Sequence, residues 1–132
     1  MTRLVPCLVV VLALVAAGCG GDSTADGVAK AYNAFAHDVV MSNFDGACRL
    51  MTKQTQADVV GAGKALTGGV HPCGAALEST MGLLDQGDME SLSRKVDASA
   101  VSVKGDSATV KAHGNKASLT SQDGSWLIAR EP

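Results

Sequence analysis

The 132-residue chain has no cluster of basic residues anywhere along its length. Its 11 Lys and Arg are interspersed with 13 Asp and Glu, and the formal net charge is −2. Binding to nucleic acid needs a basic patch or stripe, so the composition argues against a nucleic-acid partner. The same distribution leaves no polybasic segment that would reinforce contact with an anionic membrane.

Catalytic signatures are missing as well. The sequence contains no Gly-x-Ser-x-Gly, no His-Glu-x-x-His and no pair of carboxylates at a recognisable spacing. The segment Gly61-Ala62-Gly63-Lys64 departs from a phosphate-binding loop, because Asp58 stands where that pattern needs Gly and Ala65 where it needs Ser or Thr. The three histidines are each expected to be solvated: His37 on a helix, His71 in a loop and His113 at the end of a strand. We therefore predict no catalytic residue, no metal site and no cofactor.

No hydrophobic run is long enough to cross a membrane, but a shorter one opens the chain. Arg3 is followed by fourteen residues, Leu4 to Ala17, whose apolar character is disturbed only by Pro6. A helix of that length rises about 21 Å, against about 30 Å for a bilayer core. A basic residue followed by a run of this length is typical of a signal peptide, and Cys7 inside the run is expected to be removed with it.

The run ends at Leu14-Val15-Ala16-Ala17-Gly18-Cys19, which resembles the lipobox of bacterial lipoproteins. That resemblance implies cleavage between Gly18 and Cys19 and attachment of a diacylglyceryl group to the Cys19 thiol. Residues 1–18 are then a signal peptide and residues 19–26 a flexible tether. The protein is expected to be held by its lipid on the extracytoplasmic side of the cell membrane. The alternative is ordinary secretory cleavage after Gly18, which would give a freely secreted protein.

Two cysteines remain in the exported part of the chain, Cys48 and Cys73. An exported domain folds under oxidising conditions, so an even pair of cysteines predicts a disulfide. With 24 residues between them, chain entropy gives a stabilisation of roughly 3–4 kcal/mol. The alternative is a metal site that adds His71, but only one residue separates His71 from Cys73 and the sequence supplies no fourth ligand.

Residues 27–132 are predicted to form one domain that begins with helices. The first helix is expected from about Thr24 to Met41, because apolar residues recur there at the helical period: Val28, Tyr32, Phe35, Ala36 and Val39. Further helices are expected after Asp45, from Lys53 to about Leu66, and after Pro72 as far as Gln86-Gly87, followed by a short turn at Met89 and Leu92.

From Asp97 the apolar period changes to two, which predicts strands. Four are expected, at Ala98–Lys104, Ser107–His113, Lys116–Ser121 and Ser125–Arg130, joined by turns at Gly105-Asp106, Gly114-Asn115 and Gln122-Asp123-Gly124. Ala100 and Val101 are out of phase, which predicts a bulge. One shared core is expected to contain Leu77, Met81, Val101, Val110, Leu119, Trp126 and Ile128. Helices followed by an antiparallel meander predict an α+β fold with the helices on one face of the sheet.

This order of elements resembles the NTF2-like superfamily, and within it small actinobacterial lipoproteins. The resemblance is carried by short segments: Asn43 to Cys48, Cys73, Val101 to Val103, Gly105 to Val110, and Gly124 to Ile128. It implies a cone in which a curved four-stranded sheet wraps a long helix, often around a pocket. Different members use that pocket for binding, or for isomerase or hydrolase chemistry.

Aromatic residues make up only 3% of the chain, whereas the enzymatic members of that superfamily line their pockets with acidic, tyrosyl and aromatic side chains. The candidate pocket residues are Tyr32, Phe35 and Trp126, although a helical Tyr and a strand Trp are also typical of a core. We expect a non-enzymatic module that binds an envelope protein or a small apolar molecule. The alternative hypothesis is a cryptic enzyme that uses the cone pocket, which carboxylates converging on Tyr32 would favour.

Overall fold

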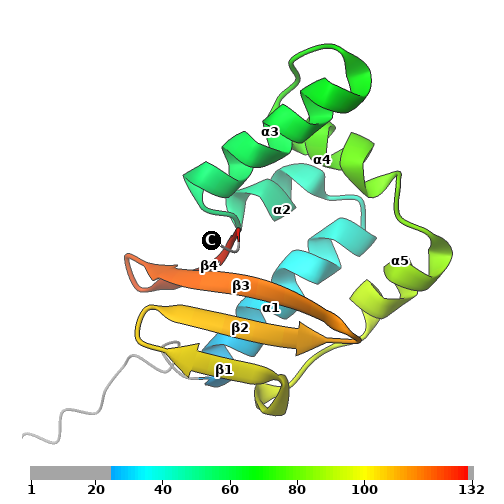
Figure 1. Cartoon of the computed structure of the whole chain (residues 1–132). Coiled ribbons are helices and arrows are strands. Elements are labelled where there is room, and N and C mark those ends of the chain that lie inside the picture. The colour runs from blue at the N-terminus through cyan, green and yellow to red at the C-terminus, as the bar shows by residue number, and fades with distance from the viewer. Residues whose placement is uncertain (1–24, 131–132) are drawn as a thin grey trace, which may run out of the picture.

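A computed structural model describes residues 25–130, and five helices precede four strands within that range (Figure 1). The helices are α1 (Ala25–Val40), α2 (Phe44–Arg49), α3 (Lys53–Thr67), α4 (Cys73–Met81) and α5 (Gln86–Ser93). The predicted signal peptide and the predicted lipidation site at Cys19 lie outside the described residues. Helix α1 begins one residue after the predicted start near Thr24, so the tether ends earlier than residue 26, and Ala25 and Asp26 belong to the first turn of α1.

After a 3₁₀ turn, η2 (Ala98–Ala100), the chain forms β1 (Val101–Lys104), β2 (Ser107–Ala112), β3 (Asn115–Gln122) and β4 (Ser125–Ala129). The strands pair in sequence order, all antiparallel, in a sheet that is not closed into a barrel. The predicted α+β class and the meander are confirmed. The turn η2 occupies the position of the predicted bulge, because the Asp97 side chain accepts a hydrogen bond from the Ser99 N–H and curls the chain there.

Two other boundaries differ from the sequence prediction. The helix that follows Pro72 ends at Met81, and α5 begins separately because Asp85 accepts a hydrogen bond from the Asp88 N–H at 2.8 Å and caps a new helix. The β2–β3 turn is His113-Gly114, one residue earlier than predicted. Both residues have positive φ, 51° and 87°, which is the geometry that a two-residue hairpin favours.

Helix α1 lies across one face of the sheet, the inner face (Figure 1). Its apolar stripe packs on alternate strand residues to form a first core cluster: Val28, Tyr32, Ala36, Ala108, Val110, Ala112, Leu119 and Trp126. Buried and exposed residues alternate along β2. Val110 is 0% exposed on the inner face, whereas its neighbour Lys111 is exposed on the opposite side of the sheet. We call this opposite side the outer face.

A second core cluster joins α2 and α4 to the end of α1: Val39, Ala47, Cys48, Met51 and Leu77. The expectation of one shared core is therefore wrong for Leu77, which lies in this cluster, and for Met81, which packs against it. The reason is that α2, α3 and α4 group beyond the β4 edge and not over the sheet (Figure 1). Ile128 packs against both clusters and connects them.

Two close contacts tie α4 to α2 and to α3. The predicted disulfide is present and ties Cys48 of α2 to Cys73 at the start of α4, with a Cα–Cα distance of 6.2 Å. Helices α3 and α4 touch at Gly63, where an added Cβ would lie 2.6 Å from the Ala76 Cβ. Gly63 is therefore needed for the close packing of α3 on α4. The comparison of residues 61–64 with a phosphate-binding loop gave no sign of this role.

The chain between α2 and α3 extends the sheet beside β4. The Ile128 N–H donates to the Leu50 carbonyl at 2.8 Å, and the Thr52 N–H donates to the Ile128 carbonyl at 2.9 Å. This pairing places the N-terminus of α3 next to the sheet. Among residues 25–130, no helix has the length and apolar character needed to span a membrane.

Candidate functional site

An apolar cavity of about 410 Å³ lies where α1, α5 and the β2–β3 turn meet. Tyr32, Phe35 and Val39 line it from α1, because the i, i+3 and i+7 spacing puts all three on one helix face. Met81 and Leu84 close the side toward α4, and Leu92 lines it from α5. Its volume falls in the range of small-molecule sites.

Several apolar side chains of this cavity are only half-buried. Phe35, Met81, Leu84 and Leu92 all keep part of their surface exposed. Helix α5 has no fully buried residue of its own. A molecule bound in the cavity would remove this apolar surface from water, which stabilises the complex by about 25 cal/mol for each Å² that becomes buried.

Tyr32 supplies a hydroxyl to the cavity wall. The residue is buried, and loss of solvent around its ring raises the pKa of the Tyr32 phenol above its ordinary value. The hydroxyl therefore stays protonated at neutral pH. It has no hydrogen-bond partner among the residues that the structure describes, so it remains able to donate to or accept from a ligand.

The rim of the cavity is polar. Asp88 and Ser91 line it from α5, and His113 and Asn115 from the β2–β3 turn. Asp88 is the only carboxylate in the described lining, and it is exposed in the first turn of α5. Within residues 25–130, no group of three or more His, Cys, Asp or Glu could hold a metal ion. His71, the third ligand of the alternative metal site, is exposed while Cys48 and Cys73 are bonded to each other.

The three candidate pocket residues do not share one site. Tyr32 and Phe35 line the apolar cavity together, whereas Trp126 lies in the first core cluster and touches a separate shallow depression beside Lys30 and Arg49. The sequence placed Trp126 correctly on an inward strand position. Trp126 pairs with Ser121 beside the β3–β4 turn, whereas the cavity lies at the β2–β3 turn, the opposite end of the sheet.

One residue that positions the cavity was missed. Asn33 lies outside the predicted apolar stripe of α1 and holds the chain that follows α5: its Nδ2 donates to the Val96 carbonyl at 2.8 Å and its Oδ1 accepts from the Val96 N–H at 2.9 Å. This two-way contact fixes the exit of α5 against α1. The residues are 63 positions apart, so no local pattern predicts the pair.

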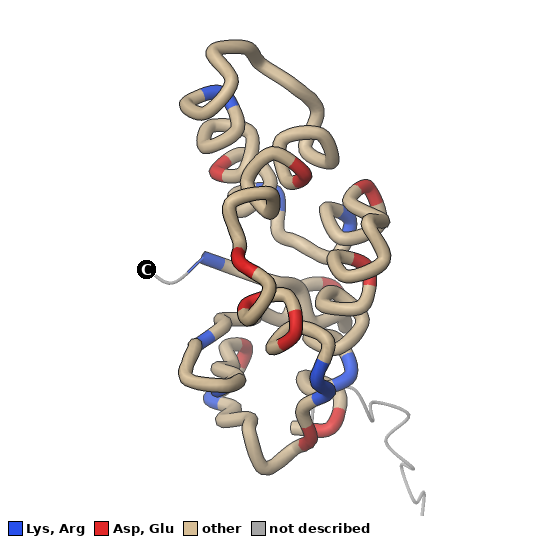
Figure 2. The backbone as a smooth tube through the Cα atoms, turned by 90° about the vertical axis from the view of Figure 1, so that its right-hand side faces the viewer, with Lys and Arg blue, Asp and Glu red and all other residues tan. Residues whose placement is uncertain are grey.

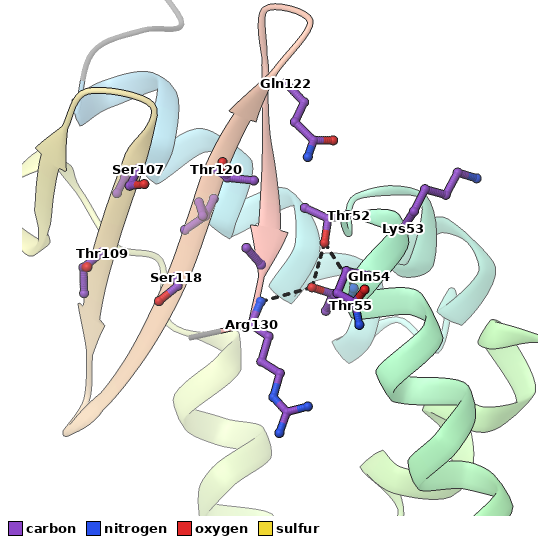
Figure 3. Close-up of a pocket in the computed structure, with 13 residues that line it drawn as sticks. Thr52, Lys53, Gln54, Thr55, Ser107, Thr109, Ser118, Thr120, Gln122 and Arg130 are labelled. Carbon is purple, nitrogen blue, oxygen red and sulfur yellow. Dashed lines mark hydrogen bonds between the residues drawn. The ribbon is translucent and has the colours of Figure 1, made fainter. Parts of the chain in front are cut away.

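A second, polar depression lies on the outer face of the sheet. It has a volume of about 700 Å³ and lies between β2, β3 and the first turn of α3 (Figure 3). Hydroxyl groups dominate its lining: Thr52, Thr55, Ser107, Thr109, Ser118 and Thr120. The wall toward α3 is fixed by hydrogen bonds, since the Thr52 hydroxyl accepts from the Thr55 N–H at 3.1 Å and the Thr55 hydroxyl accepts from the Arg130 N–H at 3.1 Å.

Comparisons with protein families, curated proteins and solved structures found no match to this chain. The two concave sites are therefore interpreted from their own chemistry.

Proposed function

We propose that the protein is a lipid-anchored extracytoplasmic module that binds a small, mainly apolar molecule in the cavity between α1, α5 and the β2–β3 turn. The observation that carries the proposal is the cavity itself, about 410 Å³ in volume and lined by apolar side chains that remain half-buried. The free Tyr32 hydroxyl suits a ligand with one hydrogen-bonding group. The lipid at Cys19 would hold this cavity at the membrane surface.

The NTF2-like interpretation is part of this proposal. In its support, a long helix, α1, lies against the inner face of a four-stranded antiparallel sheet, and the cavity lies beside that helix at one end of the sheet. An arrangement of this kind is what the resemblance implies for a cone with a pocket.

Binding is favoured over the alternative of a cryptic enzyme by the charges around Tyr32. The alternative needs carboxylates that converge on the hydroxyl, but the described lining has one carboxylate, Asp88, on the exposed rim. The raised pKa of Tyr32 keeps its phenol protonated, so it is suited to hydrogen bonding and poorly suited to act as a base.

Titration with the fluorescent probe 1-aminoanthracene tests the cavity, since its emission increases in an apolar environment. We expect saturable binding to the full-length chain. Leu84→Trp enlarges a side chain in the lining and should abolish the binding. Leu83→Trp makes the same change at the neighbouring residue, which is 71% exposed and outside the lining, and should leave the binding intact.

Equal binding by the two variants, or no saturable binding by the wild-type chain, would contradict the proposal. Thermal unfolding of each variant checks that Leu84→Trp has not unfolded the domain.

A further inference from the structure

All charged residues of the four strands are lysines, and all lie on the outer face of the sheet. They are Lys104, Lys111 and Lys116. The strand register places them on one face, because directly paired residues share a face: Lys111 pairs with Lys116, and Lys104 pairs with Ser107, which pairs with Thr120 four residue pairs along from Lys111 and Lys116. A basic face is thus assembled from lysines that are scattered in the sequence.

Lys111 and Lys116 stand directly opposite each other on β2 and β3. Like charges at such a position destabilise a sheet. Neither of these lysines, nor Lys104, forms an ion pair with any residue in the range 25–130. This contrasts with the helices, where basic and acidic positions are interspersed (Figure 2). An anion bound to the outer face would relieve this repulsion.

The polar depression is basic as well. Its lining contains two basic residues, Lys53 and Arg130, and no described acidic residue. Lys53 is exposed in the first turn of α3, while the Arg130 guanidinium lies 3.5 Å from Asp58 and is partly neutralised there. The remaining polar groups are the Ser and Thr hydroxyls named above and the amides of Gln54 and Gln122 (Figure 3).

We propose that the outer face of the sheet, together with the first turn of α3, binds an anionic glycan, a chain of sugars that carry carboxylate or phosphate groups. The lysines complement its charge, and the Ser, Thr and Gln side chains hydrogen-bond to its hydroxyls. A neutral glycan would lack an aromatic surface to stack on, since no aromatic residue lines the depression. A flat anionic membrane would reach the lysines but not the hydroxyls that lie within the depression.

This binding is independent of the apolar cavity, which lies on the other side of the sheet. The probe is a hexamer of galacturonic acid, which carries one carboxylate per sugar, and the matched control is the same hexamer with every carboxylate methyl-esterified. We expect the acid form to bind the full-length chain and to shift the amide resonances of Thr109 and Ser118. The esterified form should bind at least about tenfold more weakly, and added salt should weaken the acid form.

Charge variants locate the site. The double variant Lys53→Gln, Lys116→Gln should raise the Kd for the acid hexamer about tenfold, because each exposed ion pair contributes up to roughly fivefold. The control Lys64→Gln, Lys95→Gln removes the same charge from exposed positions outside the outer face and should bind like the wild type.

Three results would overturn the proposal: equal binding of the acid and esterified hexamers, equal loss of affinity in the two double variants, or binding to phosphatidylglycerol vesicles that the double variant Lys53→Gln, Lys116→Gln weakens and that an excess of the acid hexamer does not displace. The last result would assign the outer face to the membrane.

Discussion

At the scale of single residues, the alternation of apolar and polar side chains is what the sequence reveals best. It places Val110 toward α1 and Lys111 on the outer face, as the structure has them. The helical period likewise identifies the stripe of α1 that reaches the cavity through Tyr32 and Phe35. Asn33 could not be predicted in this way, because the role of its polar side chain depends on a partner that is far away in the sequence.

The assignment of alternate β2 residues to the inner and outer faces of the sheet can be tested directly. Val110→Asp would place an unpaired carboxylate in the first core cluster and should lower the free energy of unfolding by at least about 3 kcal/mol. Lys111→Asp, one residue along, should change it by no more than about 0.5 kcal/mol, since it replaces one of two opposed lysines on the exposed face. Urea unfolding of both variants measures the difference. A similar loss of unfolding free energy in the two variants would mean that Val110 and Lys111 are assigned to the wrong faces of the sheet.

At the scale of secondary-structure elements, type and order follow from periodicity, while the boundaries follow from local contacts that periodicity does not contain. The helix predicted to reach Gln86-Gly87 ends at Met81, and the Asp85 cap starts α5 where only a short turn at Met89 and Leu92 was predicted, so that α5 forms a wall of the cavity. The His113-Gly114 turn brings an unexpected His to the rim. The packing of α3 on α4 depends on Gly63, whose small size has meaning only once its neighbour Ala76 is known.

Substitution of the α3 glycines tests that packing. Gly63→Ala should lower the free energy of unfolding by about 1–3 kcal/mol, because the new Cβ would lie 2.6 Å from the Ala76 Cβ. Gly61→Ala meets nothing within 4 Å and should stabilise the helix by up to about 1 kcal/mol. Thermal unfolding of both proteins distinguishes the outcomes, and a stabilised Gly63→Ala protein would disprove the close contact.

The disulfide ties α2 to α4 and should contribute strongly to stability. Cys48→Ala combined with Cys73→Ala should lower the free energy of unfolding by about 2–5 kcal/mol, the usual effect of losing a native disulfide in a small domain. Under reducing conditions the wild type should become as unstable as the variant. A difference that persists in reductant would show that packing of the two side chains, and not the covalent link, is responsible.

At the scale of the whole molecule, the fold places an apolar cavity and a basic, hydroxyl-lined face on opposite sides of one sheet. The α+β class could be predicted from the change of period at Asp97. The two core clusters could not, because they depend on α2, α3 and α4 packing beyond the β4 edge. The basic face could not be seen in the sequence either, since strand pairing alone brings Lys111 next to Lys116.

The proposed membrane anchor depends on a single thiol. Cys19→Ser should abolish incorporation of a fatty-acid probe during growth and release the protein from the membrane fraction, because Cys19 is the cysteine that follows the predicted cleavage site after Gly18. Cys7→Ser, within the predicted signal peptide, is the control and should label normally. Labelling of the Cys19→Ser protein at the wild-type level would refute the lipoprotein interpretation.

The central claim is that the cavity beside α1 is a ligand site, and the most direct test is an experimental structure of the chain purified from its native envelope. We expect continuous density of a small molecule between Tyr32 and Leu84, in contact with Phe35 and Leu92, and within hydrogen-bond distance of the Tyr32 hydroxyl. Side chains of α5 packed into that space, with Leu84 and Leu92 fully buried and no room left for a ligand, would contradict it.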